Sequence, residues 1–308
     1  MIMALAGGVG GARMANGLAA CLPPEDLLVV VNVGDDFEHL GLPISPDLDT
    51  VCYTLAGLND RERGWGLAGE SWNFMAAIRE LGGEDWFNLG DRDLATHILR
   101  RTLLETQSLS EVTRHICERL GIVHRIVAAT DDRLRSIVHS DEGTLAFQDY
   151  FVRRRAEPAF RSIDFDGAEA ARPSPAFAAA LDDPDLEAII LCPSNPVLSI
   201  APILAIGDVR DRLRRSPAPV LAISPFIGGE AIKGPAAKIF NELNIPCSPQ
   251  GLISCLGDVV DALVIDHADA ESSGTGLPTL ATDTLMRDDA GQKRLASEVL
   301  AFARSVRR

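Results

Sequence analysis

Short apolar runs alternate along the chain with helix-length segments in which apolar positions recur at helical spacing. This alternation is typical of parallel β-strands joined by crossover helices. We expect strands at 2–6, 27–33, 122–128, 187–192, 220–224 and 262–266. Helices are expected at 12–21, 202–214, 234–243 and 252–260. The pattern therefore predicts an α/β fold built on a Rossmann-like, three-layer parallel sheet.

Two segments depart from this alternation. Residues 50–120 carry helical patterns with few strand signals, which predicts a helical insertion over one edge of the sheet. Residues 136–165 alternate apolar and polar positions and predict a small antiparallel β element. No repeat, low-complexity segment or linker divides the 308 residues, so we expect 1–308 to form one domain. After residue 270 we expect a loop and a closing helix.

The composition limits the classes of partner. No apolar run approaches the roughly 20 residues of a membrane span, and the first residues lack the basic flank of a signal peptide. A net charge of −15 argues against general nucleic-acid binding. The six cysteines form no Cys-x-x-Cys pair, which favours a reducing compartment. We expect a cytoplasmic protein that binds neither nucleic acid nor membranes.

Four glycines, at 7, 8, 10 and 11, connect the first predicted strand to the next helix. The dinucleotide fingerprint fails because Arg13 stands where its third glycine belongs, and the segment has no lysine for a nucleotide-triphosphate loop. Glycine still allows a ligand to approach the backbone, and the first amides of a helix bind anions. We expect Gly8, Gly10 and Gly11 to contact phosphate. A tight turn without a ligand is the alternative.

Acidic residues follow the second predicted strand, in VNVGDDFEHLGLPISPDLDT. Ser45 and Pro46 are typical of an N-cap and a first helical position. Asp47 and Asp49 then lie in the first turns, where capping and the helix dipole alone would favour acidic residues. Carboxylates at a strand end are also ligands that Mg²⁺ prefers when it bridges diphosphate oxygens. We predict Asp36 and Asp49 as Mg²⁺ ligands.

The segment FNLGDRDLATH places Asp91, Arg92 and Asp93 just before a predicted helix. A helix start with acidic residues in its first turn explains this pattern. A guanidinium between two carboxylates is equally suited to face an anion or an aromatic ring. The residues by themselves leave both interpretations of Arg92 open.

Two later loops also follow predicted strands. CPSNPVLSIAPIL offers Ser194 and Asn195 as donors, and SPFIGGEAIKGPAAK offers Gly228 and Gly229 with Lys233 as a point charge. Ligands of open α/β sheets bind at the carboxyl ends of the strands. These loops therefore predict a nucleotide or diphosphate ligand.

Other catalytic patterns are absent from the sequence. There is no His-Glu-x-x-His, no Gly-x-Ser-x-Gly and no kinase signature set. We interpret His97 and His115 as ordinary packed or surface histidines. Direct transfer between bound substrates, with a metal ion stabilising phosphate charge, is the predicted reaction type.

Taken in order, GGVGGARMANGL, SPDLDT, LGDRDLATH, PSNPVLSI and SPFIGGEAIKGPAAK resemble the 2-phospho-L-lactate transferase family of coenzyme F-420 biosynthesis. The resemblance extends from the first strand to about residue 266. It implies a homodimeric Rossmann-like enzyme. Such an enzyme moves a 2-phospholactyl or phosphoenolpyruvyl group from a guanosine diphosphate conjugate to the hydroxyl of 7,8-didemethyl-8-hydroxy-5-deazariboflavin. GMP is released with the help of Mg²⁺.

The resemblance also implies roles for individual residues. Asp49 and Arg92 match positions that contact the deazaflavin, and Asp49 is the expected catalytic residue. We assign the glycine loops, Ser194 and Asn195 to guanosine diphosphate on physical grounds. Arg13 and Lys233 are candidates to hold the donor's carboxylate. We expect Asp49→Asn to abolish transfer and leave the fold intact, since asparagine also caps helices.

A related family is the alternative. Its members resemble this chain in the glycine-rich start and the acidic strand end, but they bind uridine diphosphate sugars and regulate cell-wall and carbon metabolism. The SPDLDT and GDRD segments favour the transferase.

Overall fold

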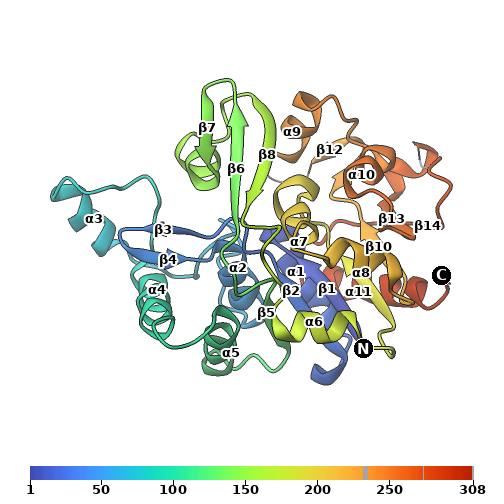
Figure 1. The fold of residues 1–308 in the computed structure, drawn as a ribbon, viewed down its shortest axis with the longest axis horizontal. Helices are drawn as coiled ribbons and strands as arrows, with labels where there is room; N and C mark the ends of the chain where they lie inside the picture. Colours follow the sequence, from blue (N-terminus) through green and yellow to red (C-terminus); the bar gives the residue numbers. More distant parts are fainter. Residues whose placement is uncertain (232–234, 273, 307–308) are drawn as a thin grey trace.

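A seven-stranded parallel sheet forms the centre of the computed structural model, which describes residues 1–231, 235–272 and 274–306 (Figure 1). Its strand order is β14-β13-β10-β9-β1-β2-β5. The strands are β1 (Ile2–Ala6), β2 (Leu27–Val31), β5 (Arg125–Ala128), β9 (Ala188–Leu191), β10 (Val220–Ile223), β13 (Ala262–Asp266) and β14 (Thr279–Thr282). The predicted Rossmann-like sheet is confirmed. The loop predicted over β14 is wrong, because backbone pairing with β13 makes this short, threonine-rich segment an edge strand.

Helices cover both faces of this sheet. On one face α1 (Gly8–Ala19) packs against α2 (Pro46–Leu55) and α11 (Asp289–Ala303). In front of the sheet in Figure 1 lie α6 (Pro175–Leu181) and α8 (Val209–Arg215). The remaining helices of this half are α7 (Ala201–Leu204), α9 (Ala236–Glu242) and α10 (Pro249–Leu256). The continuous helix predicted at 202–214 is wrong, because a turn containing Gly207, at φ +41°, separates α7 from α8.

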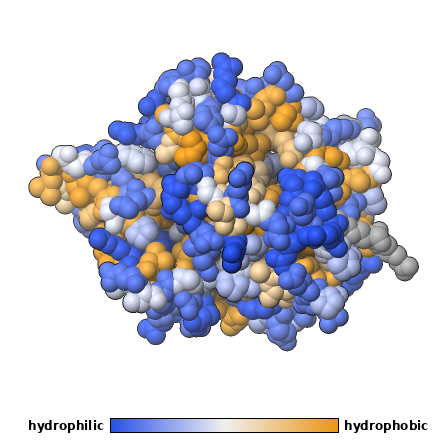
Figure 2. Space-filling view, in the orientation of Figure 1, coloured by the Kyte–Doolittle hydropathy of each residue, from blue (hydrophilic) through white to orange (hydrophobic). Residues whose placement is uncertain are grey.

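The helical insertion is confirmed. It contains α3 (Asn73–Glu80), α4 (Asp91–Leu103) and α5 (Leu109–Arg119). An antiparallel hairpin that the sequence analysis does not predict, β3 (Phe37–His39) with β4 (Leu42–Ile44), lies beside it. The insertion extends to the left in Figure 1, and Figure 2 shows hydrophobic surface at the end that carries α3.

The small antiparallel element is also confirmed. It consists of β6 (Arg135–Ser140), β7 (Gly143–Ala146) and β8 (Phe160–Asp166), in the order β7-β6-β8. This sheet rises above the main sheet in Figure 1, and its apolar side chains share a core with α9. A further hairpin joins β11 (Phe226–Ile227) to β12 (Glu230–Ala231).

The direction of strand addition reverses between β1 and β9. From β1 the chain continues to β2 on one side, whereas β9 leads to β10 on the other. Right-handed crossovers place the connecting helices on opposite faces, which opens a crevice beyond the carboxyl ends of β1 and β9. The fold therefore offers a ligand site at this reversal.

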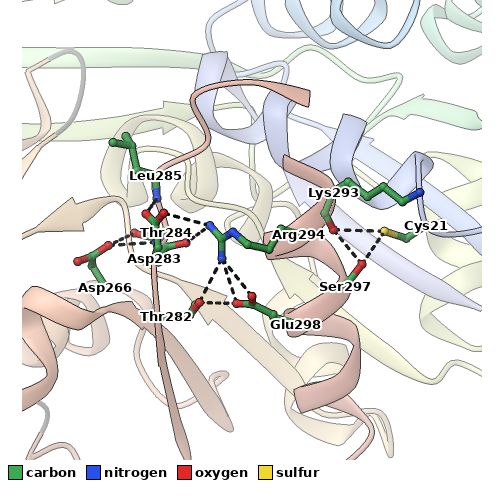
Figure 3. A network of polar contacts seen from close by, with 10 residues as sticks. All are labelled: Cys21, Asp266, Thr282, Asp283, Thr284, Leu285, Lys293, Arg294, Ser297 and Glu298. Carbon is green, nitrogen blue, oxygen red and sulfur yellow. Dashed lines mark hydrogen bonds and ion pairs between the residues drawn. The ribbon is translucent and has the colours of Figure 1, made fainter. Parts of the chain in front are cut away.

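The segment after β14 borders that crevice and is held by two anchors (Figure 3). Asp266 at the end of β13 accepts hydrogen bonds from the backbone and the hydroxyl of Thr284 (3.0 and 3.2 Å). Arg294 of α11 donates to the carbonyl of Asp283 and to the hydroxyl of Thr282. These bonds fix residues 283–286 beside the sheet.

A search of the described helices for a membrane span found none of sufficient length and apolarity.

Candidate functional site

A cavity of about 510 Å³ lies at the carboxyl ends of β1 and β9. Its wall is formed by the first turn of α1, by α2 and α4, by the segments 147–152 and 193–199, and by Thr284–Met286. Aromatic side chains also line it, namely Tyr53, Trp65, Phe87, Phe147 and Phe151. This volume and mixed lining are typical of a small-molecule site.

Gly7 and Ser194 join the ends of the two central strands. The Ser194 hydroxyl donates to the Gly7 carbonyl (2.7 Å) and accepts from the Gly7 amide (3.1 Å). A Cβ atom on Gly10 would lie 2.2 Å from the Pro193 carbonyl oxygen, and one on Gly11 would lie 2.5 Å from Ser194 Oγ. These two glycines therefore allow the chain itself to pack closely. They lie inside α1, which begins at Gly8 and not at the predicted residue 12.

Asp47 occupies the amino-terminal end of α1. Its Oδ1 accepts a hydrogen bond from the Gly8 amide (2.6 Å), and its Oδ2 accepts one from the Asn32 side chain (3.0 Å). Burial raises the pKa of Asp47 to about 6, although both hydrogen bonds favour the charged form. An acidic side chain of the protein thus lies where the sequence predicts phosphate.

Four buried side chains on α2 and α4, namely Asp49, Tyr53, Asp93 and His97, form the polar wall of the cavity, and the buried Arg100 supports it without lining the cavity. Asp49 is paired with Arg100, and its Oδ2 lies 3.7 Å from His97 Nδ1. His97 Nε2 lies 3.2 Å from Asp93 Oδ2. The Tyr53 hydroxyl donates to Asp93 Oδ1 over 2.6 Å. Helical spacing explains the cluster, because residues four apart on one helix, such as Asp93 and His97, project from the same side.

The two carboxylates of this wall have opposite pKa shifts. Burial raises the pKa of Asp49, although Arg100 and His97 act to lower it. For Asp93 burial also acts to raise the pKa, but His97 and Tyr53 outweigh it and lower the pKa below its usual value. Neighbouring acids with diverging pKa values are common where proton transfer or metal binding takes place.

The same wall fits a divalent cation. Asp49, Asp93 and His97 each offer one ligand atom within 4.8 Å of the others. Among the described side chains, the buried Asp49 Oδ2 has no hydrogen-bond partner. The two carboxylates suit Mg²⁺ or Mn²⁺, whereas the imidazole adds a nitrogen donor that is more typical of transition metals.

Asp36, the other predicted metal ligand, lies near this wall. Its Oδ2 accepts a hydrogen bond from Ser45 (2.8 Å), and its buried Oδ1 has no partner among the described side chains. Burial raises the pKa of Asp36 to about 7. The predicted N-cap at Ser45 has the expected position before Pro46, but its hydroxyl bonds Asp36 and caps no helical amide.

The structure brings together only some of the site residues predicted from the sequence. The cavity is lined by Gly8, Gly10, Asp49, Ser194 and Asn195. Among the described residues, Gly11, Asp36, Arg92, Gly228 and Gly229 do not line it. Lys233 lies outside the described residues.

Local contacts explain several of these positions. The exposed Arg92 donates to the Ala68 carbonyl oxygen (2.9 Å). Gly228 and Gly229, at φ +59° and +80°, form the two-residue turn between β11 and β12, where this backbone favours glycine. The Asn195 side chain accepts from the amides of Val197 and Leu198 and so caps the π-helical turn Pro196–Ile200.

The sequence did not predict Tyr53 and His97 of the polar wall, or Arg100, which pairs with Asp49. The interpretation of His97 as an ordinary packed histidine overlooked that it stands four residues after Asp93. Tyr53 likewise stands four residues after Asp49. Each spacing is visible in the sequence. Only the side-chain contacts between α2 and α4 show that these residues form one cluster.

Known proteins resemble this chain over nearly its whole length. The family model described as 2-phospho-L-lactate transferase CofD matches residues 2–301. The chain is 40% identical to a phosphoenolpyruvate transferase from Kitasatospora aureofaciens, over 99% of this chain and 98% of that protein. It is 38% identical to a 2-phospho-L-lactate transferase from Methanopyrus kandleri, over 98% and 97%.

A solved structure shares the fold. A crystal structure of a UPF0052-family protein from Bacillus halodurans matches with a TM-score of 0.62, over 97% of this chain and 98% of that one. The two sequences are 12% identical, so this likeness concerns the fold alone.

Proposed function

Since the chain belongs to the 2-phospho-L-lactate transferase CofD family and is an enzyme of coenzyme F-420 biosynthesis, we propose a specific reaction for it. It transfers a 2-phospholactyl or phosphoenolpyruvyl group from a guanosine diphosphate conjugate. The acceptor is the hydroxyl of 7,8-didemethyl-8-hydroxy-5-deazariboflavin, and GMP leaves.

One observation carries this proposal. Gly8 and Gly10 in the first turn of α1 and Asp49 of α2 line the same cavity. A diphosphate at the helix start and an acceptor hydroxyl at Asp49 would therefore meet within one enclosed space. The aromatic lining, which includes Trp65 and Phe87, suits the flat ring system of a deazaflavin.

In this proposal the protein promotes the transfer mainly by positioning the two substrates and by placing charges beside them. Asp49, held by Arg100, orients the acceptor hydroxyl towards the phosphorus atom that carries the three-carbon acid. A new bond forms from the hydroxyl oxygen to phosphorus and the hydroxyl proton passes to the Asp49 carboxylate. The bond from phosphorus to the GMP oxygen breaks, and GMP leaves with that electron pair. Gly8, Gly10 and Ser194 are the proposed contacts of the nucleotide phosphates, which would take the Gly8 amide from Asp47. Arg92, which lies outside the cavity lining, is the proposed contact of the deazaflavin.

The proposal includes Mg²⁺ as cofactor. The unpartnered oxygens of Asp36 and Asp49 support the predicted ligand pair, and Asp93 and His97 add donor atoms beside Asp49. When bound there, the ion neutralises diphosphate charge. We also propose that the protein is a homodimer located in the cytoplasm.

Titration with the fluorescent deazaflavin tests it, in the presence of Mg²⁺ and either GDP or UDP. We expect micromolar binding that pairs with GDP and weakens in Asp49→Asn and Arg92→Gln. Incubation with the guanosine diphosphate conjugate in place of GDP should then give a product whose mass identifies the transferred acid. Arg79→Gln, a change on the exposed face of α3, is the control. A response to uridine diphosphate sugars without deazaflavin binding would contradict the proposal.

A further inference from the structure

A second, smaller cavity of about 70 Å³ lies beside the first turns of α1. It adjoins the main cavity, because Val9, Arg13 and Gly64 line both. Its other walls come from the loop after α2, which contributes Arg61, and from the start of α11, preceded by Arg287. Three segments that are distant in the sequence thus bring three arginines to one small space.

The charge of this pocket is opposite to that of the protein. Three arginines face a single acidic residue, Asp289, in a chain with a net charge of −15. The other polar lining residues are the neutral Asn16, Thr54, Asn59 and Gln292. A local excess of positive charge in a concave site attracts anions.

Most of the guanidinium donors in the pocket are not used by the protein. Arg13 donates to the Met286 carbonyl oxygen (3.2 Å). Arg61 pairs with Asp289 over 2.9 Å, but both side chains are about 60% exposed, so this pair is weak and a ligand can compete with it. No described residue forms a hydrogen bond or ion pair with Arg287. Each arginine offers five N–H groups, which leaves ample capacity for an anion.

The size of the pocket selects the ligand group. One ordered water needs about 10–15 Å³ of such space, so about 70 Å³ accommodates a group of several atoms but no nucleobase. Planar guanidinium groups match a carboxylate with two parallel hydrogen bonds. A small, planar anion therefore fits this pocket best.

We propose that Arg13, Arg61 and Arg287 bind the carboxylate of the three-carbon acid on the donor. This assignment rests on the proposed function. In phospholactate and phosphoenolpyruvate, the carboxyl group is separated from the phosphoryl group by only one oxygen and one carbon atom. Its subsite must therefore adjoin the phosphate contacts at Gly8 and Gly10, and Arg13 lies one turn further along the same helix. The pocket recognises the carboxylate that all these acids share.

Calorimetric titration of the whole chain tests the subsite with two ligands, GDP and the guanosine diphosphate conjugate of lactic acid. We expect the wild type to bind the conjugate ten- to a hundredfold more tightly than GDP, as charge-assisted hydrogen bonds allow. The double variant Arg61→Gln/Arg287→Gln should lose this preference and keep its affinity for GDP. Both side chains are exposed, so the variant should fold, which circular dichroism checks.

Arg79→Gln is the matched control, because Arg79 forms a similar exposed pair with Asp85 (2.7 Å) outside both cavities. It should behave as the wild type does. An unchanged preference in the double variant would overturn the subsite, and so would an equal loss of GDP binding.

A failure of the proposed function gives a different result. If the wild type binds neither nucleotide, free 2-phospholactate becomes the probe. If 2-phospholactate binds and its binding requires Arg61 and Arg287, the anion subsite is supported although the proposed transferase function is not. Absence of that binding would overturn the subsite as well.

Discussion

The Tyr53 hydroxyl donates a 2.6 Å hydrogen bond to Asp93 and so connects α2 to the first turn of α4. Both side chains are buried, and both line the main cavity. This bond holds the insertion against the sheet domain at the point where the acceptor is proposed to bind. Its removal should affect both stability and transfer.

Tyr53→Phe leaves the buried Asp93 carboxylate without this donor, which should cost about 1–3 kcal/mol in the free energy of unfolding. Urea denaturation measures the change. Tyr150→Phe is the control, because the buried Tyr150 hydroxyl has no described hydrogen-bond partner and its loss should cost little. Equal effects of the two substitutions would contradict a stabilising role of the Tyr53 bond.

Asp49→Asn should abolish transfer, but the structure changes the expectation for the fold. Arg100 is buried against Asp49, so the substitution leaves a buried positive charge without its main partner. We expect a loss of about 3–5 kcal/mol in stability. The sequence alone does not show this pairing, since it places Asp49 only at a helix start.

The double variant Asp49→Asn/Arg100→Gln separates the two effects. Removing both charges should restore much of the stability measured by urea denaturation and leave transfer abolished. Recovery of transfer in the double variant would mean that Asp49 acts only by neutralising Arg100.

The raised pKa of Asp47 predicts how stability depends on pH. The folded-state pKa of about 6 exceeds the unfolded value of 3.8, so the folded protein holds more protons between these pH values. Stability therefore falls as the pH rises from about 4 to 6. At roughly 1.4 kcal/mol per pH unit, the loss attributable to Asp47 approaches 3 kcal/mol.

Asp47→Asn removes this titration. Unfolding midpoints of both proteins between pH 4 and 8, without metal ions, should show the wild type losing stability relative to the variant across this range. The difference between the two curves isolates Asp47 from other titrating groups. Parallel curves would show that Asp47 has an ordinary pKa.

Gly10→Ala should destabilise the protein by several kcal/mol. The new methyl group would overlap the Pro193 carbonyl oxygen, and a backbone atom in a buried loop cannot move aside cheaply. Gly291→Ala on α11 is the control, because its Cβ atom would meet nothing closer than 3.4 Å and alanine favours helices. Thermal unfolding of both variants provides the comparison, and a Gly10→Ala midpoint near that of the wild type would contradict the close packing.

Chelation of divalent cations should stop transfer and added Mg²⁺ should restore it. Bound Mg²⁺ should also raise the unfolding temperature, because a ligand that binds only the folded state stabilises it. His97→Gln should weaken this thermal shift if His97 Nε2 contributes to the site. A shift of wild-type size in His97→Gln would restrict the ligands to carboxylates.

The sequence by itself determined six of the seven strands of the main sheet and most of the helices that cover it. Runs such as Ile2–Ala6 and Leu27–Val31 are apolar at every position, as expected of a strand buried on both faces. The motifs from GGVGGARMANGL to SPFIGGEAIKGPAAK, taken in their order along the chain, also indicated the family. Gly8 and Asp36 could be placed just after strand ends, because the loops that follow parallel strands lie at one edge of the sheet.

Only the tertiary structure decided which of these loops share a cavity. The turn formed by Gly228 and Gly229 does not line it, whereas Tyr53, Asp93 and His97 enter because α2 packs beside α4. Side-chain contacts between distant segments depend on how helices cross, and no local pattern encodes that. For the same reason the three arginines of the smaller cavity meet only in the folded chain.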